Sequence, residues 1–248
     1  MPDTTIKTEI LIHDLKVPIS VIDAGAKSLL NRQDSYGPLT EKQEKVLKRI
    51  IRNTLTTQRL VNDVLELGRS REGVMIFSDF SVASLVTGVL VEIFDLSDPG
   101  VAELIRETHS YDELNNVITK SGARVVFSPG CWKAVVHLDE AKVRQILRNL
   151  VTNAMKHRAD RVEISGEITN RQLTLKVSDD GRGIPASDQK RIFETYFTTG
   201  SSLENAIQSH GLGLAGVMVL LKDMGGKLTL NSGDGKGAEF IVTIPLQR

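Results

Sequence analysis

Two long stretches with a helical hydrophobic period, separated by one turn signal, occupy the N-terminal part of the chain. Apolar residues recur at helical spacing over residues 6–32 and again from Thr40 to about Arg71. Gly37 and Pro38 lie between the two stretches, and Thr40 is a suitable N-cap for the second. The pattern predicts an antiparallel helical hairpin.

Each helix of this hairpin would carry one apolar stripe. In the second helix the stripe is formed by Val46, Ile50, Leu60, Val64 and Leu67. A hairpin of this size buries too little apolar surface to be comfortably stable alone. We therefore expect a homodimer in which two hairpins form a four-helix bundle.

The pattern changes after Gly73 to short β-like runs that alternate with helical segments, beginning with a run at Val74–Phe77. The fold class expected is α+β, a helical hairpin followed by an α/β sandwich with helices on one face of a mixed sheet. The expected domains are residues 1–72 and 73–248. Residues 96–120 form an additional helical segment to which we assign no chemistry.

Charge and cysteine content exclude several classes of protein. The 31 basic and 31 acidic side chains cancel, so no global field favours nucleic acid or direct contact with an anionic membrane. The single cysteine, Cys131, excludes an internal disulfide and is expected to be a small buried apolar residue. The longest apolar stretch, Val82–Phe94, is too short and too polar to span a bilayer.

The segment RNLVTNAMKH, residues 148–157, places polar side chains along one face of a predicted helix. Asn149 and Asn153 are four residues apart, and Lys156 or His157 continues the stripe. An amide oxygen can ligate a hard cation, and an ammonium group can meet a phosphate.

Two glycine motifs follow at positions where the chain changes element. In SDDGRGIP, residues 178–185, Asp179 follows a predicted strand and could accept a hydrogen bond from an exocyclic amine, while Gly181 and Gly183 allow close backbone approach to a flat ring. In HGLGLAG, residues 210–216, Gly211 and Gly213 open a helix whose unpaired N–H groups could hold phosphates. Each motif alone is weak, because glycine commonly serves turns.

In this order, and with a glycine turn at residues 233–240, the motifs resemble those of the sensor histidine kinases of two-component signalling. Residues 148–157 resemble the N box of that family, 179–183 the G1 box, 192–197 the F box and 211–214 the G2 box. HDLKVP, which begins at His13, resembles the H box. The resemblance covers almost the whole chain except residues 96–120.

The resemblance implies a dimerisation and phosphotransfer hairpin joined to a Bergerat-type ATP-binding domain. It assigns the adenine amine to Asp179, Mg²⁺ to Asn153, and phosphates or ribose to Lys156 and His157. The expected ATP-binding residues are Asn149, Asn153, Lys156, His157, Asp179, Gly181, Gly183, Ile184, Phe193, Gly211, Leu212, Gly213 and Leu214.

His13 and Asp14 are the expected catalytic residues. Neutral imidazole is a competent nucleophile towards a γ-phosphoryl group when one nitrogen loses its proton as the other attacks, and Asp14 can accept or orient that proton. The resemblance implies relay of the phosphoryl group to an aspartate of a response-regulator receiver domain. The expected location is the cytoplasm, either as a protein without an anchor or as the cytoplasmic part of a longer, membrane-anchored sensor.

Two alternatives remain open from the residues. One is a degenerate module that binds nucleotide, or only dimerises, without kinase activity. The other is a hydrolysing ATPase related to gyrases, disfavoured because Asn149 stands where those proteins carry a glutamate that activates water. Val17 stands where many members of the kinase family carry Thr or Asn, which predicts weak phosphatase activity towards the response regulator.

Overall fold

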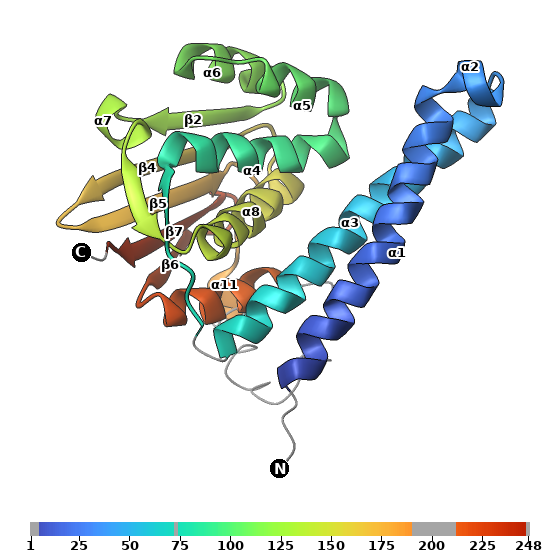
Figure 1. Cartoon of the computed structure of the whole chain (residues 1–248). Coiled ribbons are helices and arrows are strands. Elements are labelled where there is room, and N and C mark those ends of the chain that lie inside the picture. Colours follow the sequence, from blue (N-terminus) through green and yellow to red (C-terminus); the bar gives the residue numbers. More distant parts are fainter. Residues whose placement is uncertain (1–4, 72–73, 190–211, 247–248) are drawn as a thin grey trace. The chain divides into compact units, whose positions relative to one another are not determined.

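The computed structural model describes residues 5–71, 74–189 and 212–246 (Figure 1). The chain divides into two compact units, Met1–Arg69 and Ser70–Arg248. Each unit is described here by itself.

The first unit is the helical hairpin that the sequence predicts. It consists of α1 (Thr5–Asn31), the short α2 (Gln33–Tyr36) and α3 (Glu41–Arg71). Thr40 caps α3 as expected, because its Oγ1 accepts from the Gln43 backbone N–H at 3.3 Å while the Gln43 side chain accepts from the Thr40 N–H at 2.8 Å. The two long helices are antiparallel, and Thr54 Oγ1 donates to Asp23 Oδ1 at 3.1 Å between them.

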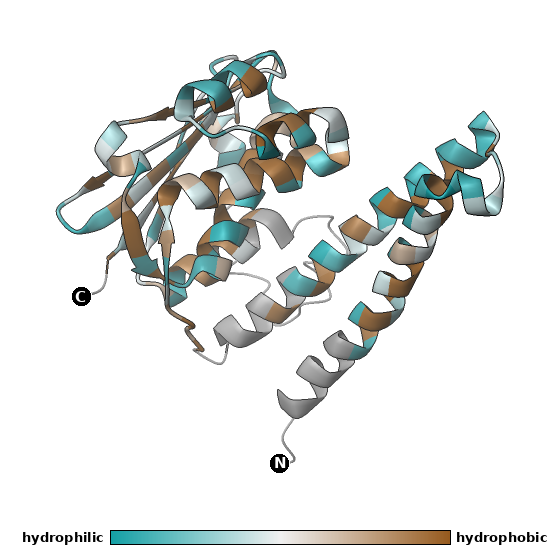
Figure 2. Ribbon diagram, turned by 45° about the horizontal axis from the view of Figure 1, so that its top comes forward, coloured by the Kyte–Doolittle hydropathy of each residue, from teal (hydrophilic) through white to brown (hydrophobic). Residues whose placement is uncertain are grey.

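The hairpin leaves most of its apolar side chains exposed. Among the hairpin residues whose side chains the structure describes, only Ala26 and Thr54 are buried. Val17 is 53% exposed and Val21 is 66% exposed, and Figure 2 shows hydrophobic residues along both long helices. This exposure agrees with the expectation that one hairpin alone lacks a core.

The second unit is built on a five-stranded mixed sheet in the order β2-β4-β5-β7-β6. Among the strands that the structure describes in this sheet, β2 and β4 are parallel, and the pairs β4–β5, β5–β7 and β6–β7 are antiparallel. A separate antiparallel pair joins β1 to β3. The strands are β1 (Ser78–Ser81), β2 (Ala123–Phe127), β3 (Val135–Leu138), β4 (Val162–Thr169), β5 (Gln172–Asp179), β6 (Lys227–Ser232) and β7 (Ala238–Pro245).

Helices cover one face of this sheet, as the α+β prediction requires (Figure 1). Within the described residues, the helices of this unit are α4 (Val82–Ser97), α5 (Pro99–Arg106), α6 (Tyr111–Thr119), α7 (Pro129–Trp132), α8 (Glu140–His157) and α11 (Leu212–Asp223). Buried side chains of α8, such as Val143, Ile146 and Leu150, pack with α4, α11 and strands β4 and β5 to form the core. Within the described residues, no helix combines the length and hydropathy that a bilayer span requires.

One predicted strand is wrong. Residues 74–77 are not in a strand, and the first strand begins at Ser78. The backbone of this segment is bound instead by side chains of the α8 N-terminus, since Ile76 N donates to Asp139 Oδ2 at 2.9 Å and Lys142 Nζ donates to the Val74 carbonyl at 2.8 Å.

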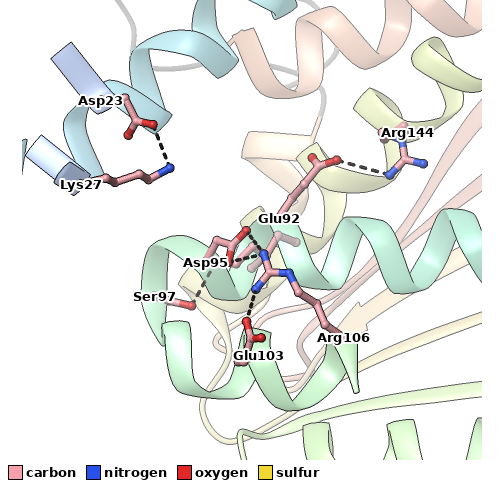
Figure 3. A network of polar contacts seen from close by, with 9 residues as sticks. Asp23, Lys27, Glu92, Asp95, Ser97, Glu103, Arg106 and Arg144 are labelled. Carbon is pink, nitrogen blue, oxygen red and sulfur yellow. Dashed lines mark hydrogen bonds and ion pairs between the residues drawn. The ribbon is translucent and has the colours of Figure 1, made fainter. Parts of the chain in front are cut away.

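Residues 96–120 have a structural role that the sequence did not reveal. Tyr111 Oη and the Asn115 amide bind the backbone of the edge strand β2: Asn115 Oδ1 accepts from Val125 N at 2.9 Å, and Tyr111 Oη donates to the Val125 carbonyl at 2.7 Å. Figure 3 shows how α5 is held to α4, with Arg106 between Asp95 and Glu103. The segment therefore covers an edge that would otherwise offer free N–H and C=O groups to another chain.

Candidate nucleotide-binding site

Helix α8 presents the four polar residues predicted for the site. Asp139 caps the helix by accepting from Lys142 N at 3.2 Å, and Lys156 and His157 lie in the last turn, where positive charge suits the helix dipole. Asn149 and Asn153 are partly exposed at the margin of the buried face of the helix, while Lys156 and His157 are exposed. The structure thus keeps these side chains out of the sheet core.

Asp179 ends β5 and begins the loop that follows. It pairs with Val162 of β4 and with Ala238 of β7, which fixes its backbone in the middle of the sheet. Its Oδ1 accepts from the Gly181 backbone N–H at 2.9 Å. This hydrogen bond lies within the loop, fixes the orientation of the Asp179 carboxylate and uses one of its two oxygens.

The glycines of this loop are required by packing within the domain. A Cβ at Gly181 would overlap the carbonyl oxygen of His157, the last residue of α8. Gly183 has φ +73°, and a Cβ there would overlap the carbonyl oxygen of Gly233. The loop after β5 therefore lies directly against the C-terminal end of α8 and the turn between β6 and β7.

Further hydrogen bonds fix this loop to the turn at residues 232–237. Ile184 N donates to Ser232 Oγ at 2.8 Å, and Ser232 Oγ donates to the Gly237 carbonyl at 2.7 Å. Gln189 Nε2 donates to the Ile184 carbonyl at 2.9 Å and to the Ser232 carbonyl at 3.0 Å. Ile184 is thus held in place by residues that the sequence motifs did not include.

Asp180 also fixes this loop, although the sequence motifs gave it no role. Its Oδ1 accepts from three successive backbone N–H groups, those of Ala159, Asp160 and Arg161, at 3.1, 3.0 and 3.0 Å. These bonds, with that from Arg161 the largest contribution, lower the pKa of Asp180 below its ordinary value. The carboxylate ties the connection between α8 and β4 to the loop that carries Asp179. In the sequence, its position next to Asp179 was the one feature that could have indicated this role.

The remaining predicted residues lie at the start of α11 or outside the described residues. Leu212, Gly213 and Leu214 form the first turn of α11, which packs against α8. The N–H groups of such a turn lack partners within the helix and suit an anion. Gly211 and Phe193 lie outside the described residues.

His13 and Asp14 lie in α1, in the first unit. Asp14 is exposed, and Val17, four residues after His13, faces solvent on the same helix. Of the His13 residue the structure describes only the helical backbone.

These features are those of an α/β sandwich with a candidate nucleotide site. Helices α8 and α11 lie on one face of the mixed sheet, and the loop that carries Asp179 and its glycines lies against the C-terminal end of α8. The two helices and this loop together form the candidate site. Residues 138–248 match the family described as histidine kinase-, DNA gyrase B-, and HSP90-like ATPase. Residues 9–73 match the His Kinase A (phospho-acceptor) domain.

Individual relatives agree with these matches. The chain is 29% identical over 243 residues to the circadian input-output histidine kinase CikA of Synechococcus elongatus, covering 95% of this chain and 29% of CikA. It is 26% identical over 247 residues to the adaptive-response sensory kinase SasA of Crocosphaera subtropica, covering 96% of this chain and 58% of SasA. The chain therefore spans less than two thirds of the length of either relative.

A solved structure has the same fold over nearly the whole chain. Full-length ShkA, crystallised in complex with AMPPNP, superposes with a TM-score of 0.62 at 25% identity, covering 98% of this chain and 46% of ShkA. With the phospho-acceptor and ATPase matches in this order, the chain belongs to the sensor histidine kinases of two-component systems.

Proposed function

We propose that this chain is the kinase core of a two-component sensor, which transfers the γ-phosphoryl group of ATP to His13 and then to an aspartate of a response-regulator receiver domain. The observation that carries the proposal is the junction of Asp179, Gly181 and the end of α8, since it places an oriented carboxylate beside the helix that bears Asn149 and Asn153. The proposed domains are residues 1–72 for phosphotransfer and 73–248 for ATP binding.

The residues present fit a magnesium–nucleotide complex. No cluster of three or more His, Cys, Asp or Glu side chains that could hold a metal occurs in the described parts of the chain, and the site instead offers the amide oxygen of Asn153. Mg²⁺ is commonly held by one or two protein oxygens together with substrate phosphates and water, which is what this site offers. Bound in this way, Mg²⁺ would neutralise charge on the phosphates.

The chain's own groups then have defined tasks in the proposed reaction. Asp179 accepts a hydrogen bond from the adenine amine, and the first turn of α11 donates N–H groups to the phosphates. One nitrogen of His13 forms the new bond to the γ-phosphorus as the bond to the bridging oxygen breaks and ADP leaves. The proton on the other ring nitrogen passes to Asp14.

Dimerisation through the hairpin belongs to the same proposal. Leu15, Val17 and Val21 are exposed on α1, and Val17 and Val21 line a mostly apolar hollow together with Lys16, Ser20 and Ala24. A second copy would cover this surface. We place the chain in the cytoplasm, where ATP and response regulators are available.

The test is incubation of the full chain with γ-labelled ATP and Mg²⁺. We expect an acid-labile, alkali-stable phosphoprotein that is absent in His13→Gln, and transfer of label to a receiver domain from a panel. Release of free phosphate without a labelled protein would indicate a hydrolysing ATPase. Neither product would indicate a regulatory module without kinase activity.

A further inference from the structure

The side chain of Gln189 joins two separate parts of the chain beside the loop that carries Asp179. Its Nε2 donates to the Ile184 carbonyl at 2.9 Å and to the Ser232 carbonyl at 3.0 Å, and the residue is half-buried. Both partners are acceptors, so the nitrogen of the amide and not its oxygen points at them. Gln189 therefore acts as a double donor that holds residue 184 to residue 232.

The hydroxyl of Ser232 makes a second connection between the same two parts. It accepts from the Ile184 N–H at 2.8 Å and donates to the Gly237 carbonyl at 2.7 Å. The N–H and the carbonyl of Ile184 are therefore both bonded inside the domain, the first to Ser232 and the second to Gln189. These two side chains together determine where Ile184 lies.

The loop from Asp179 to Ile184 is held differently at its two ends. At its start, Asp179 pairs with Val162 and Ala238 of the neighbouring strands, so the sheet holds its backbone. At its end, Ile184 lies outside the strands, and the two side-chain contacts described above hold it instead. Removing those contacts would release the second end of the loop.

The orientation of the Asp179 carboxylate depends on the middle of this loop. Its Oδ1 accepts from the Gly181 N–H at 2.9 Å, so a shift of the loop changes the direction of the donor and of the carboxylate with it. A hydrogen bond weakens steeply as its angle becomes unfavourable, so a rotated carboxylate is a poorer acceptor for a fixed donor. The turn at residues 232–237 adds a direct contact, since a Cβ at Gly237 would overlap the Asp179 carbonyl oxygen.

We propose that Gln189 is a positioning residue for recognition of the nucleotide base. By holding residues 184 and 232 together, its amide keeps the Asp179 carboxylate in the direction needed to accept from the exocyclic amine of adenine. The inference rests on the proposed function, and Gln189 acts through Asp179 and not on the nucleotide itself. Its effect is on the choice between bases, because only a base with an amine gains from an oriented acceptor.

The test compares the binding of ADP and IDP to the full chain by calorimetry, with Mg²⁺ present. The hypoxanthine of IDP has a carbonyl oxygen in place of the adenine amine, so it lacks the donor for Asp179. We expect wild type to prefer ADP. We expect Gln189→Leu to bind ADP about tenfold more weakly, the loss of one hydrogen bond to a charged group, while its affinity for IDP changes less than about twofold. A variant that only weakened the fold would lose both affinities together.

Gln189→Lys separates hydrogen-bond donation from bulk. An ammonium group can donate to both carbonyls, so this variant should keep the preference for ADP that Gln189→Leu loses. Ser187→Lys is the control for added positive charge, since residue 187 is exposed and lies close to Gln189 in the sequence. We expect it to leave the preference for ADP unchanged.

The possible results distinguish this inference from the proposed function. Equal weakening of ADP and IDP by Gln189→Leu would overturn the inference in favour of a general effect on the fold. Unchanged binding of both would show that the loop is positioned without this amide, and loss of the preference in Gln189→Lys would show that donation is not what matters. A wild-type chain that binds ADP and IDP equally would refute the role of Asp179 and the inference with it. A wild-type chain that binds neither would instead refute the proposed function.

Discussion

Lys142 and Asp223 form a buried ion pair that joins the first turn of α8 to the last residue of α11. Lys142 Nζ lies 2.7 Å from Asp223 Oδ2, and the lysine side chain is completely buried while that of the aspartate is 19% exposed. The same ammonium group donates to the Val74 carbonyl at 2.8 Å. One lysine thus connects the two helices that bear the candidate site to the segment that follows the hairpin.

Replacing Lys142 by Met should destabilise the second unit strongly. The change leaves the Asp223 carboxylate without its ammonium partner and the Val74 carbonyl without its donor. Breaking one partner of a buried ion pair typically costs about 3–5 kcal/mol. Denaturant unfolding of the full chain, followed by near-UV circular dichroism, measures the change.

The double variant Lys142→Met with Asp223→Leu is the control for this prediction. It removes both charges, and we expect it to be more stable than Lys142→Met alone, because replacing a whole buried pair by apolar groups is often nearly neutral. If Lys142→Met were as stable as wild type, the pair would contribute nothing to the fold.

Gly183→Ala should disrupt the loop after β5 more than a comparable substitution nearby. Gly183 has φ +73° and its Cβ would overlap the Gly233 carbonyl, whereas Gly235 has φ +68° and open space around it. Gly235→Ala therefore suffers only the backbone strain, about 1 kcal/mol, while Gly183→Ala adds displacement of the neighbouring turn. We expect a larger fall in melting temperature and weaker ADP binding for Gly183→Ala, and equal effects of the two variants would contradict the packing.

Asp180 should make the second unit sensitive to acid. Its three backbone hydrogen bonds lower the pKa in the folded state below the ordinary value of 3.8. The stabilisation is therefore fully present above that value and is lost as the pH falls through the lower folded pKa. In Asp180→Asn the side chain keeps an acceptor oxygen but does not ionise. The melting temperature of this variant should therefore fall less than that of wild type between about pH 5 and pH 2.

The contribution of Asp180 to stability in acid must be distinguished from that of Glu113. A hydrogen bond from the His109 backbone N–H also lowers its pKa, so the wild-type acid profile contains both groups. Glu113→Gln should remove its own part of the profile and leave the part that depends on Asp180. If the melting temperatures of wild type and Asp180→Asn fell equally as the pH was lowered, the three N–H bonds would not favour the ionised form of Asp180.

The sequence predicts the amphipathic hairpin and the order of strands and helices in the second unit. It does so because the spacing of apolar residues along a helix or strand shows which side of that element is buried. The role of Lys142 could not be predicted, since it reads as an ordinary solvated helix lysine and its partner lies 81 residues away. Asp180 was overlooked for a related reason, because its partners are backbone N–H groups that no side-chain pattern marks. The segment at residues 74–77 read as a strand because its apolar residues match the pattern, although side chains of α8 bind its backbone instead.

On the proposed function, Val17→Thr should increase the rate at which the chain dephosphorylates a phosphorylated receiver domain. Val17 lies one helical turn after His13 and is 53% exposed, so a threonine would present its hydroxyl to a docked receiver without disturbing a core. The valine has no group that can position a water molecule. Decay of a phosphorylated receiver domain, measured with ADP present, should be slow with wild type and faster with the variant, while labelling of His13 stays unchanged. Fast decay with wild type and no gain with the variant would count against this role of position 17.

The edge of the sheet at β2 depends on two side chains of α6. Tyr111→Phe removes one hydroxyl that both donates to the Val125 carbonyl and accepts from Phe127 N at 3.0 Å, so it should cost about 1 kcal/mol or slightly more. Tyr111→Phe combined with Asn115→Leu leaves the β2 backbone without these partners, and we expect concentration-dependent association through the exposed edge. Light scattering at increasing protein concentration measures this association. A double variant that stays as dispersed as wild type at every concentration would mean that α6 covers the edge by bulk alone and that its hydrogen bonds are dispensable for this purpose.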